Sequence, residues 1–158
     1  MSQIFPVRFV PMDLNDSAAR YLECYRDAWR VAHGSLAGFD EKACLMGAAS
    51  RAARHPGSLL EARRGDDFAG VLAMDDQRKK DIGWIAFCYV AEAYRRQGIG
   101  RAMIEKAAAR YAAMGRRALR LTVAPENPAV AFYERMGFRC TGTEPGALED
   151  LYVMELEL

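Results

Sequence analysis

The chain has 158 residues, of which 51% are hydrophobic and 27% are charged, a balance typical of a globular domain with a sizeable core. We therefore expect residues 1–158 to form a single domain. The net charge of +1 provides no overall field that would gather nucleic acid, so general DNA or RNA binding is disfavoured.

Membrane insertion, secretion and metal binding also lack support in the sequence. Residues 1–12 have no basic start followed by an apolar core, and the longest apolar run is far short of a membrane span, so we expect a cytoplasmic protein. The cysteines form no Cys-x-x-Cys pair and the two histidines show no metal-ligand spacing. We expect no metal and four reduced thiols, which are Cys24, Cys44, Cys88 and Cys140.

The first half of the chain predicts one strand, two helices and a pair of strands. Alternating apolar residues indicate strands, whereas capping residues followed by apolar residues at helical spacing indicate helices. The elements expected here are a strand over 4–10, a helix capped by Asp16 or Ser17 and ending near Ala32, a helix from Asp40 to Arg54, paired strands over 58–63 and 68–74, and a polar loop over 75–81.

Aromatic side chains recur every fourth residue along the first predicted helix and therefore lie on one slanted stripe. The stripe consists of Tyr21, Tyr25, Trp29 and His33. Core packing is the default interpretation of the first two residues. Trp29 and His33 lie near the end of the helix and could instead line a substrate pocket, where His33 is one candidate for a catalytic base.

The second half of the chain opens with an almost wholly apolar run, Ile82–Val90, which predicts a central strand buried on both faces. The elements that follow are a helix from Ile99 to Gly115, a strand over 117–123, a short helix begun by Asn127 and Pro128 and ended by Gly137, and strands over 138–143 and 151–158. The order β-α-α-β-β-β-α-β-α-β-β predicts an α/β fold around one mixed sheet.

The turn Tyr94–Gly100 joins the central strand to the next helix and resembles an anion-binding site. Gly98 and Gly100 let backbone approach a ligand, and the first amide groups of the helix have no partners within it. Those donors and the helix dipole can hold a phosphate, and Arg95 and Arg96 add positive charge. The alternative is a solvated, basic helix start.

Two common nucleotide sites do not fit this turn. A dinucleotide fingerprint requires a third glycine, where Met103 stands, and the strand and helix here are too far apart. A Walker A loop requires Lys-Ser or Lys-Thr, and neither pair occurs in the chain.

The block from Ile82 to Phe138 resembles the acetyl-CoA-binding core of the GNAT-type N-acetyltransferase superfamily. Its Arg/Gln-x-x-Gly-x-Gly/Ala motif is met by Arg95, Gly98 and Gly100, and residues 127–138 resemble its second landmark. Glu92 stands where many members have proline. The resemblance implies a GNAT-type α/β fold, with a mixed, mostly antiparallel central sheet of about seven strands flanked by helices.

The resemblance also implies acetyl-CoA as co-substrate. The strands over 82–90 and 117–123 would splay apart around the pantetheine arm, which would pair with the backbone of Tyr89 and Val90. Asn127 would contact the same arm, or serve only as a helix cap. Tyr133 would protonate the departing thiolate, or serve only in packing. The pyrophosphate would lie on Arg95, Arg96, Gln97, Gly98, Ile99 and Gly100.

The implied reaction is direct transfer of an acetyl group to a primary amine of a small molecule or peptide. Residues 82–90 contain no acid, so no general base can be named; remote candidates are Glu23, Glu144, Glu149 and Asp150. Glu149 and Asp150 could also attract a cationic acceptor, or be merely solvated. Cys88 could carry an acetyl group, although a strand cysteine is usually a small hydrophobe.

Two other classes of function stay open at this point. The chain could be a non-catalytic acyl-CoA-binding sensor module, or a structural subunit that kept the fold without the ligand. The intact glycines and Tyr133 count against both. A homodimer is also open.

Overall fold

A computed structural model describes residues 5–158 and confirms the predicted order of elements. Ile4, the first residue of the predicted opening strand, lies outside the described residues. The elements are β1 (Val7–Pro11), α1 (Leu14–His33), α2 (Glu41–Arg54), β2 (Leu59–Arg64), β3 (Asp67–Asp75), β4 (Ile82–Val90), the 3-10 turn η1 (Glu92–Tyr94), α3 (Ile99–Ala113), β5 (Ala118–Val123), α4 (Ala129–Arg135), β6 (Arg139–Pro145) and β7 (Asp150–Glu157).

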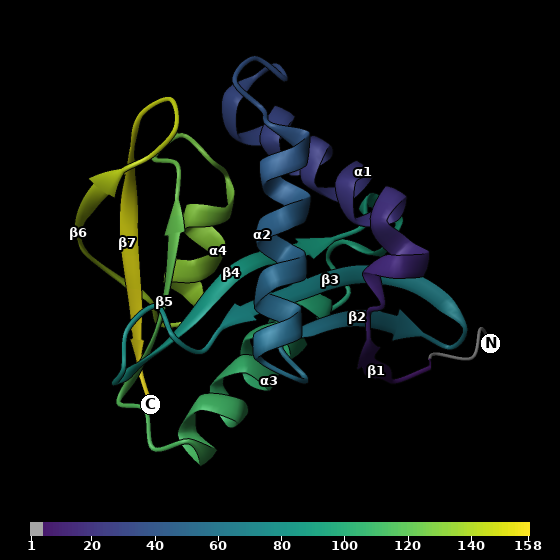
Figure 1. Cartoon of the computed structure of the whole chain (residues 1–158). Coiled ribbons are helices and arrows are strands. Elements are labelled where there is room, and N and C mark those ends of the chain that lie inside the picture. Colours follow the sequence, from purple (N-terminus) through teal and green to yellow (C-terminus); the bar gives the residue numbers. More distant parts are fainter. Residues whose placement is uncertain (1–4) are drawn as a thin grey trace.

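The strands form one seven-stranded sheet in the order β1-β2-β3-β4-β5-β7-β6. All neighbours are antiparallel except β4 and β5, which are parallel. Helices α1 and α2 cover one face of the sheet, whereas α3 and α4 pack on the other (Figure 1). The predicted mixed, mostly antiparallel sheet is therefore confirmed.

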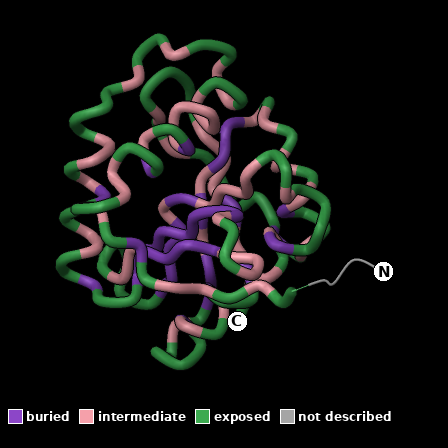
Figure 2. Tube along the Cα trace, turned by 90° about the vertical axis from the view of Figure 1, so that its right-hand side faces the viewer, coloured by how far each residue is buried: buried purple, intermediate pink, exposed green. Residues whose placement is uncertain are grey.

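The sheet separates two apolar layers, and the buried part of the chain follows its central strands (Figure 2). Alternation along β3 shows how one strand serves both layers. Leu72 and Met74 pack with the layer under α3, whereas Val71 and Ala73 pack with the layer under α1 and α2. Helix α3 buries Met103 and Tyr111 completely, as its apolar repeat predicts.

The predicted start of the first helix was wrong. Asp13, rather than Asp16 or Ser17, caps α1, and its carboxylate accepts a hydrogen bond from the amide of Asn15 at 2.9 Å. Ser17 interrupts the first turns with a non-helical φ of −117°. The helix begins at Leu14, one turn before the start that the apolar pattern predicts. Asp13 therefore caps the free amides of this additional turn.

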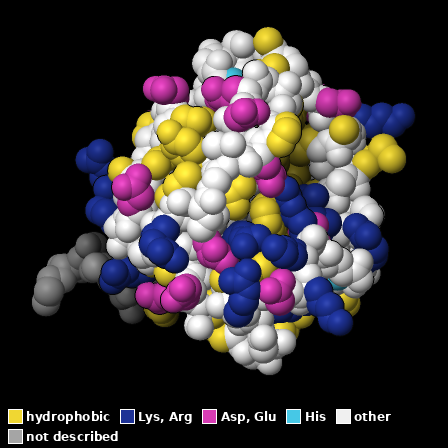
Figure 3. All heavy atoms as spheres, turned by 90° about the vertical axis from the view of Figure 1, so that its left-hand side faces the viewer, with side chains coloured by type: hydrophobic (Ala, Val, Ile, Leu, Met, Phe, Trp, Pro, Cys, Tyr) yellow, Lys and Arg dark blue, Asp and Glu magenta, His cyan; other side chains and the backbone are white. Residues whose placement is uncertain are grey.

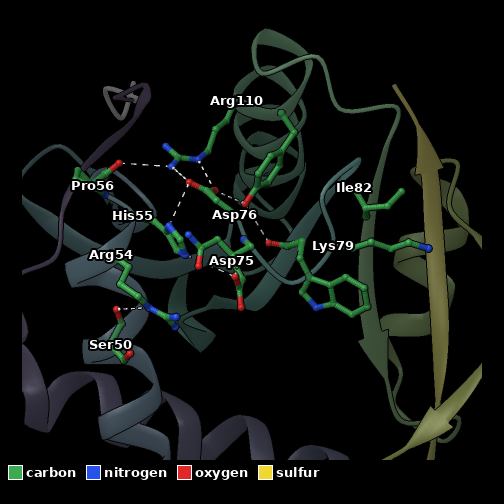
Figure 4. A network of polar contacts seen from close by, with 12 residues as sticks. Ser50, Arg54, His55, Pro56, Asp75, Asp76, Lys79, Ile82 and Arg110 are labelled. Carbon is green, nitrogen blue, oxygen red and sulfur yellow. Dashed lines mark hydrogen bonds and ion pairs between the residues drawn. The ribbon is translucent and has the colours of Figure 1, made fainter.

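The predicted polar loop after β3 is partly buried in a charged network (Figure 4). The His55 ring is 5% exposed, with its nitrogens 3.8 Å from Asp75 and 3.9 Å from Asp76. Arg110 and Tyr111 both donate hydrogen bonds to the Asp76 carboxylate. The network joins the C-terminal end of α3 to the end of β3. It is remote from the start of α3 at Ile99, which lies at the glycine turn, residues 94–100.

Among the helices of residues 5–158, none combines the length and the apolar character that crossing a membrane requires.

Candidate active site

Strands β4 and β5 separate partway along their length. Their register pairs Ile82–Trp84 with Ala118–Arg120 and then stops, although β4 keeps pairing with β3 as far as Val90. A bulge at Ala86 shifts the register with β3, since Ala73 pairs with Phe87 and Met74 with Ile85. The edge of β4 that faces β5 is consequently open to another hydrogen-bonding partner beyond Trp84.

A cavity of about 240 Å³ occupies this opening. Its walls come from the aromatic stripe of α1, from the separated parts of β4 and β5, and from the start of α4. Most of the side chains are apolar or aromatic, including Trp29, Phe87 and Leu121. Small ligands commonly bind in such a concave, mostly apolar site with a few polar groups.

The glycine turn presents an unpaired row of backbone donors. Gly98 has a φ of 83°, caps α3, and has no atom within 4 Å of where a Cβ would stand. Arg96 also has a positive φ, of 62°. Within residues 5–158, the backbone amides from Arg96 to Arg101 donate no hydrogen bond. A turn of this kind at a helix start suits a phosphate group.

Arg95 is fixed against the end of β4 by two contacts. Its Nε donates to the Val90 carbonyl at 2.9 Å, and its Nη2 lies 3.2 Å from the Asp27 carboxylate on α1. Tyr89 donates its hydroxyl to the same carboxylate at 2.5 Å. Burial and then Asp27 raise the pKa of Tyr89. Asp27 could not be predicted from the sequence, because no spacing within α1 indicates a contact with Arg95, 68 residues further along the chain.

The other side chains of the turn serve its own geometry. Gln97 donates from Nε2 to the Ala93 carbonyl at 3.2 Å, while its backbone carbonyl accepts from Arg64 at 3.3 Å. Ile99 is buried, and Gly100 lies under Phe132, where a Cβ would come 3.0 Å from the ring. The backbone amides of the turn are therefore left free for an anion, whereas these side chains are engaged within the protein.

Tyr133 reaches the cavity from α4 and is 8% exposed. Burial, followed by the neighbouring Cys88 thiol, raises the pKa of Tyr133 well above its ordinary value. Burial likewise raises the pKa of Cys88 to about 12. The Cys88 thiol is therefore protonated near neutral pH, which counts against an acetyl-cysteine intermediate.

Asn127 lies where both of the roles left open by the sequence can coexist. Its Oδ1 accepts a hydrogen bond from the amide of Ala129 at 2.9 Å and so satisfies the first amide of α4, although Pro128 rather than Asn127 occupies the cap position. Pro128 has helical angles, as expected at a helix start. Asn127 also lines the cavity beside the separated strands. A contact with the cofactor stays a prediction.

Three of the residues predicted to face the acceptor come together at one end of the cavity. The Trp29 and His33 rings lie 4.4 Å apart between centroids, and His33 Nδ1 is 3.9 Å from Glu149 Oε1. Trp29 is held by a hydrogen bond to the Ala37 carbonyl at 3.2 Å. Gly38 lies against Leu148, so the loop before β7 meets the end of α1 here.

The other proposed acids lie elsewhere. Glu144 pairs with Arg78, which stacks on the Trp84 ring. Asp150 is exposed at the start of β7, and Glu23 lines a separate surface depression beside α1. None of these three carboxylates lines the cavity. On the face drawn in Figure 3, most basic side chains lie in the lower half of the view with some acidic ones among them, whereas the upper part carries mainly acidic side chains.

Comparison with known proteins identifies this arrangement. Residues 17–138 match the model of the acetyltransferase (GNAT) family. The chain belongs to this family of acetyltransferases. The matched region contains the glycine turn, the separated strands β4 and β5, and α4. The predicted family and enzyme class are confirmed.

Solved structures share the GNAT fold at low sequence identity. Ard1 from Thermoplasma volcanium is 17% identical, with a TM-score of 0.76 and coverage of 96% of this chain and 97% of that one. The PaiA N-acetyltransferase from Thermoplasma acidophilum, solved with coenzyme A, is 16% identical, with a TM-score of 0.73 and coverage of 98% and 100%. YncA from Salmonella typhimurium, solved with its cofactor acetyl-CoA, is 20% identical, with a TM-score of 0.68 and coverage of 99% and 95%. Among curated protein sequences, none matches the GNAT chain.

Proposed function

We propose that this GNAT protein transfers an acetyl group from acetyl-CoA directly to a primary amine of a small molecule or a peptide. The observation that carries the proposal is the opening between β4 and β5, which has Tyr133 buried in its cavity, together with the unpaired amides of the turn that follows β4. Such an opening suits a long ligand with an anionic group at one end and a reactive group at the other.

The cofactor would occupy this opening along its length. The amides from Arg96 to Arg101 would hold the pyrophosphate, with Arg95 and Arg96 adding positive charge. The pantetheine amides would pair with the open edge of β4 near Tyr89 and Val90, as an added strand pairs with a sheet. Asn127 would contact the arm from the opposite side. The thioester would then lie in the cavity beside Tyr133.

The chemistry is an acyl transfer in which the bond to sulfur is exchanged for a bond to nitrogen. The lone pair of the neutral amine attacks the carbonyl carbon, and the carbon–sulfur bond breaks with its electron pair on sulfur. Tyr133 would donate its phenolic proton to the departing thiolate. The apolar walls limit water, which would otherwise hydrolyse the thioester.

Direct transfer is favoured over an acetyl-enzyme because of the state of Cys88. A thiol with a pKa of about 12 provides very little thiolate near neutral pH. The attacking group should therefore be the amine itself. Cys88→Ala is expected to retain turnover, whereas a covalent route through this thiol would lose it.

A thioester-cleavage assay tests the proposal. The protein and acetyl-CoA would be incubated with one amine class at a time: polyamines, aminoglycosides, amino acids or short peptides. Thioester cleavage would be followed by absorbance, and the acetylated product would be detected by mass spectrometry. At least one amine should accelerate cleavage and become acetylated. Binding of CoA by calorimetry without transfer to any amine class would contradict the proposal and favour a sensor.

A further inference from the structure

The acceptor amine must lose a proton during transfer, and the family assignment does not say which group of this chain accepts it. The cavity itself limits the choice. Among its lining residues, the groups that exchange protons are Tyr25, His33, Cys88 and Tyr133, and no carboxylate lines it. Burial raises the pKa of Tyr25, Cys88 and Tyr133, so all three hold their protons near neutral pH.

His33 is the remaining group, and imidazole is the side chain suited to accepting a proton between pH 5 and 8. We infer that His33 is the general base for the acceptor amine and that Glu149 positions the His33 ring. This inference rests on the proposed acetyl transfer. His33 contributes to the cavity from the last turn of α1, and its side chain is 12% exposed.

The surroundings of His33 fix the ring in place. Trp29 packs on one side at 4.4 Å between centroids. Glu149, on the loop before β7, lies 3.9 Å from Nδ1, a separation too long for a hydrogen bond but short enough for a charge interaction. Tyr25 on α1, Cys88 on β4 and Tyr133 on α4 share the cavity with the ring, and Glu149 is its ion-pair partner among the described residues. We assign the other nitrogen, Nε2, to the amine.

The proton balance of the step is complete. As the neutral amine forms its carbon–nitrogen bond, one N–H proton passes to His33 Nε2. The carbon–sulfur bond breaks, and the thiolate takes the Tyr133 proton. The products are an acetamide and free CoA thiol, after which the imidazolium gives its proton to solvent and the phenolate recovers one. An acceptor that arrives as an ammonium ion first releases a proton to solvent.

The cavity wall also favours one chemical class of acceptor amine. The cavity wall includes Trp29 beside His33, together with Ala32 and Leu151, and contains no carboxylate to pair with a second ammonium. A primary amine on an apolar or aromatic body fits this wall better than a polyamine, because the wall offers a second ammonium no carboxylate and Glu149 is engaged with His33. Glu149, which is 40% exposed, remains in contact with solvent at this end.

The test compares His33→Gln and Glu149→Gln with the parent protein, using tyramine, benzylamine and spermidine with acetyl-CoA. Arg30→Gln serves as the matched control, because Arg30 lies one turn earlier on the exposed side of α1 and does not line the cavity. Turnover is measured from pH 5.5 to 9.5. A limb of the profile that stays at one pH when amines of different basicity are compared belongs to the enzyme rather than to the amine.

We expect His33→Gln to lower turnover about 100-fold or more and to remove the enzyme's acidic limb, with unchanged CoA affinity and partial rescue by added imidazole. Glu149→Gln should lower kcat more than it changes the KM of the amine, because Glu149 holds the ring in position and does not itself contact the amine. Arg30→Gln should resemble the parent, and turnover of the parent should be higher with tyramine or benzylamine than with spermidine.

Three results would overturn the inference. If the parent acetylates an amine while His33→Gln keeps its rate and pH profile, His33 is not the base, although the proposed function stands. Faster transfer to spermidine would refute the narrowed acceptor class. If the parent cleaves acetyl-CoA with none of these amines nor with the wider panel, the proposed function fails and the inference fails with it.

Discussion

Replacing Gly98 tests the anion site with two variants that differ by one charge. Gly98 has a φ of 83° and no atom within 4 Å of the position that a Cβ would take, so a side chain fits there but strains the backbone. Gly98→Glu and Gly98→Gln should both lose about 1 to 2 kcal/mol of stability, because that is the usual cost of a left-handed conformation. For a chain of this length, the loss corresponds to about 2 to 8 °C in Tm.

Affinity for CoA should separate the two variants. A carboxylate about 4 Å from a phosphate charge costs about 1 kcal/mol at the dielectric of water and about 4 kcal/mol near a protein surface, or about 5- to 1000-fold in Kd. Gly98→Gln shares the bulk but not the charge, so Gly98→Glu should bind CoA more weakly by this factor. Calorimetry at low salt measures both. Equal Kd values for the two variants and the parent would refute a pyrophosphate position at this turn.

Three further predictions concern the proposed catalytic acid, the packing under the sheet and a buried charged network. Tyr133→Phe should lower kcat about 10- to 1000-fold with little change in CoA affinity, and unchanged kcat in steady-state assays would leave Tyr133 with a packing role only. Gly83→Ala should lower Tm by about 5 °C or more in calorimetry, because a Cβ would stand 2.1 Å from the buried Tyr111 ring; an unchanged Tm would mean that the ring moves freely. Burial alone would raise the pKa of Asp76, but hydrogen bonds from Arg110 and Tyr111 outweigh it and hold that pKa below its ordinary value. The resulting stabilisation is present above about pH 4 and is lost as pH falls further, so Asp76→Asn should be less stable than the parent at pH 7 and approach it in acid denaturation monitored by circular dichroism; a constant difference would contradict this origin.

Long elements were predictable because their periodicity is repeated over many residues. The run Ile82–Val90 is reproduced as β4 without a shift, and Ile99 begins α3 as predicted. The start of α1 was not predictable, because Asp13, Asp16 and Ser17 are all competent caps and tertiary packing decides among them.

Much of the candidate site depends on contacts between distant segments. The glycine turn is local, and its motif could be recognised in the sequence. The bulge at Ala86 depends on pairing with β3, and the contact of Asp27 with Arg95 joins segments that no sequence period relates. The meeting of His33 with Glu149 likewise depends on how the loop before β7 packs on α1. Sequence periodicity placed His33 on the correct face but could not supply its partner.

The energetics of the proposed acid depend on the dryness of the cavity. In water, a phenol near pKa 10 would protonate a thiolate near 8.5 at a cost of roughly 2 kcal/mol. Cys88 shows what this environment does to a thiol, since burial raises its pKa to about 12 beside Tyr133. A CoA thiolate formed in the same cavity would meet a similar loss of solvation and become a stronger base. Burial raises the pKa of the acid and of the leaving group together, so the proton transfer need not be as unfavourable as in water. The same burial that opposes free ionisation of Tyr133 therefore suits it to protonating a thiolate that is released beside it.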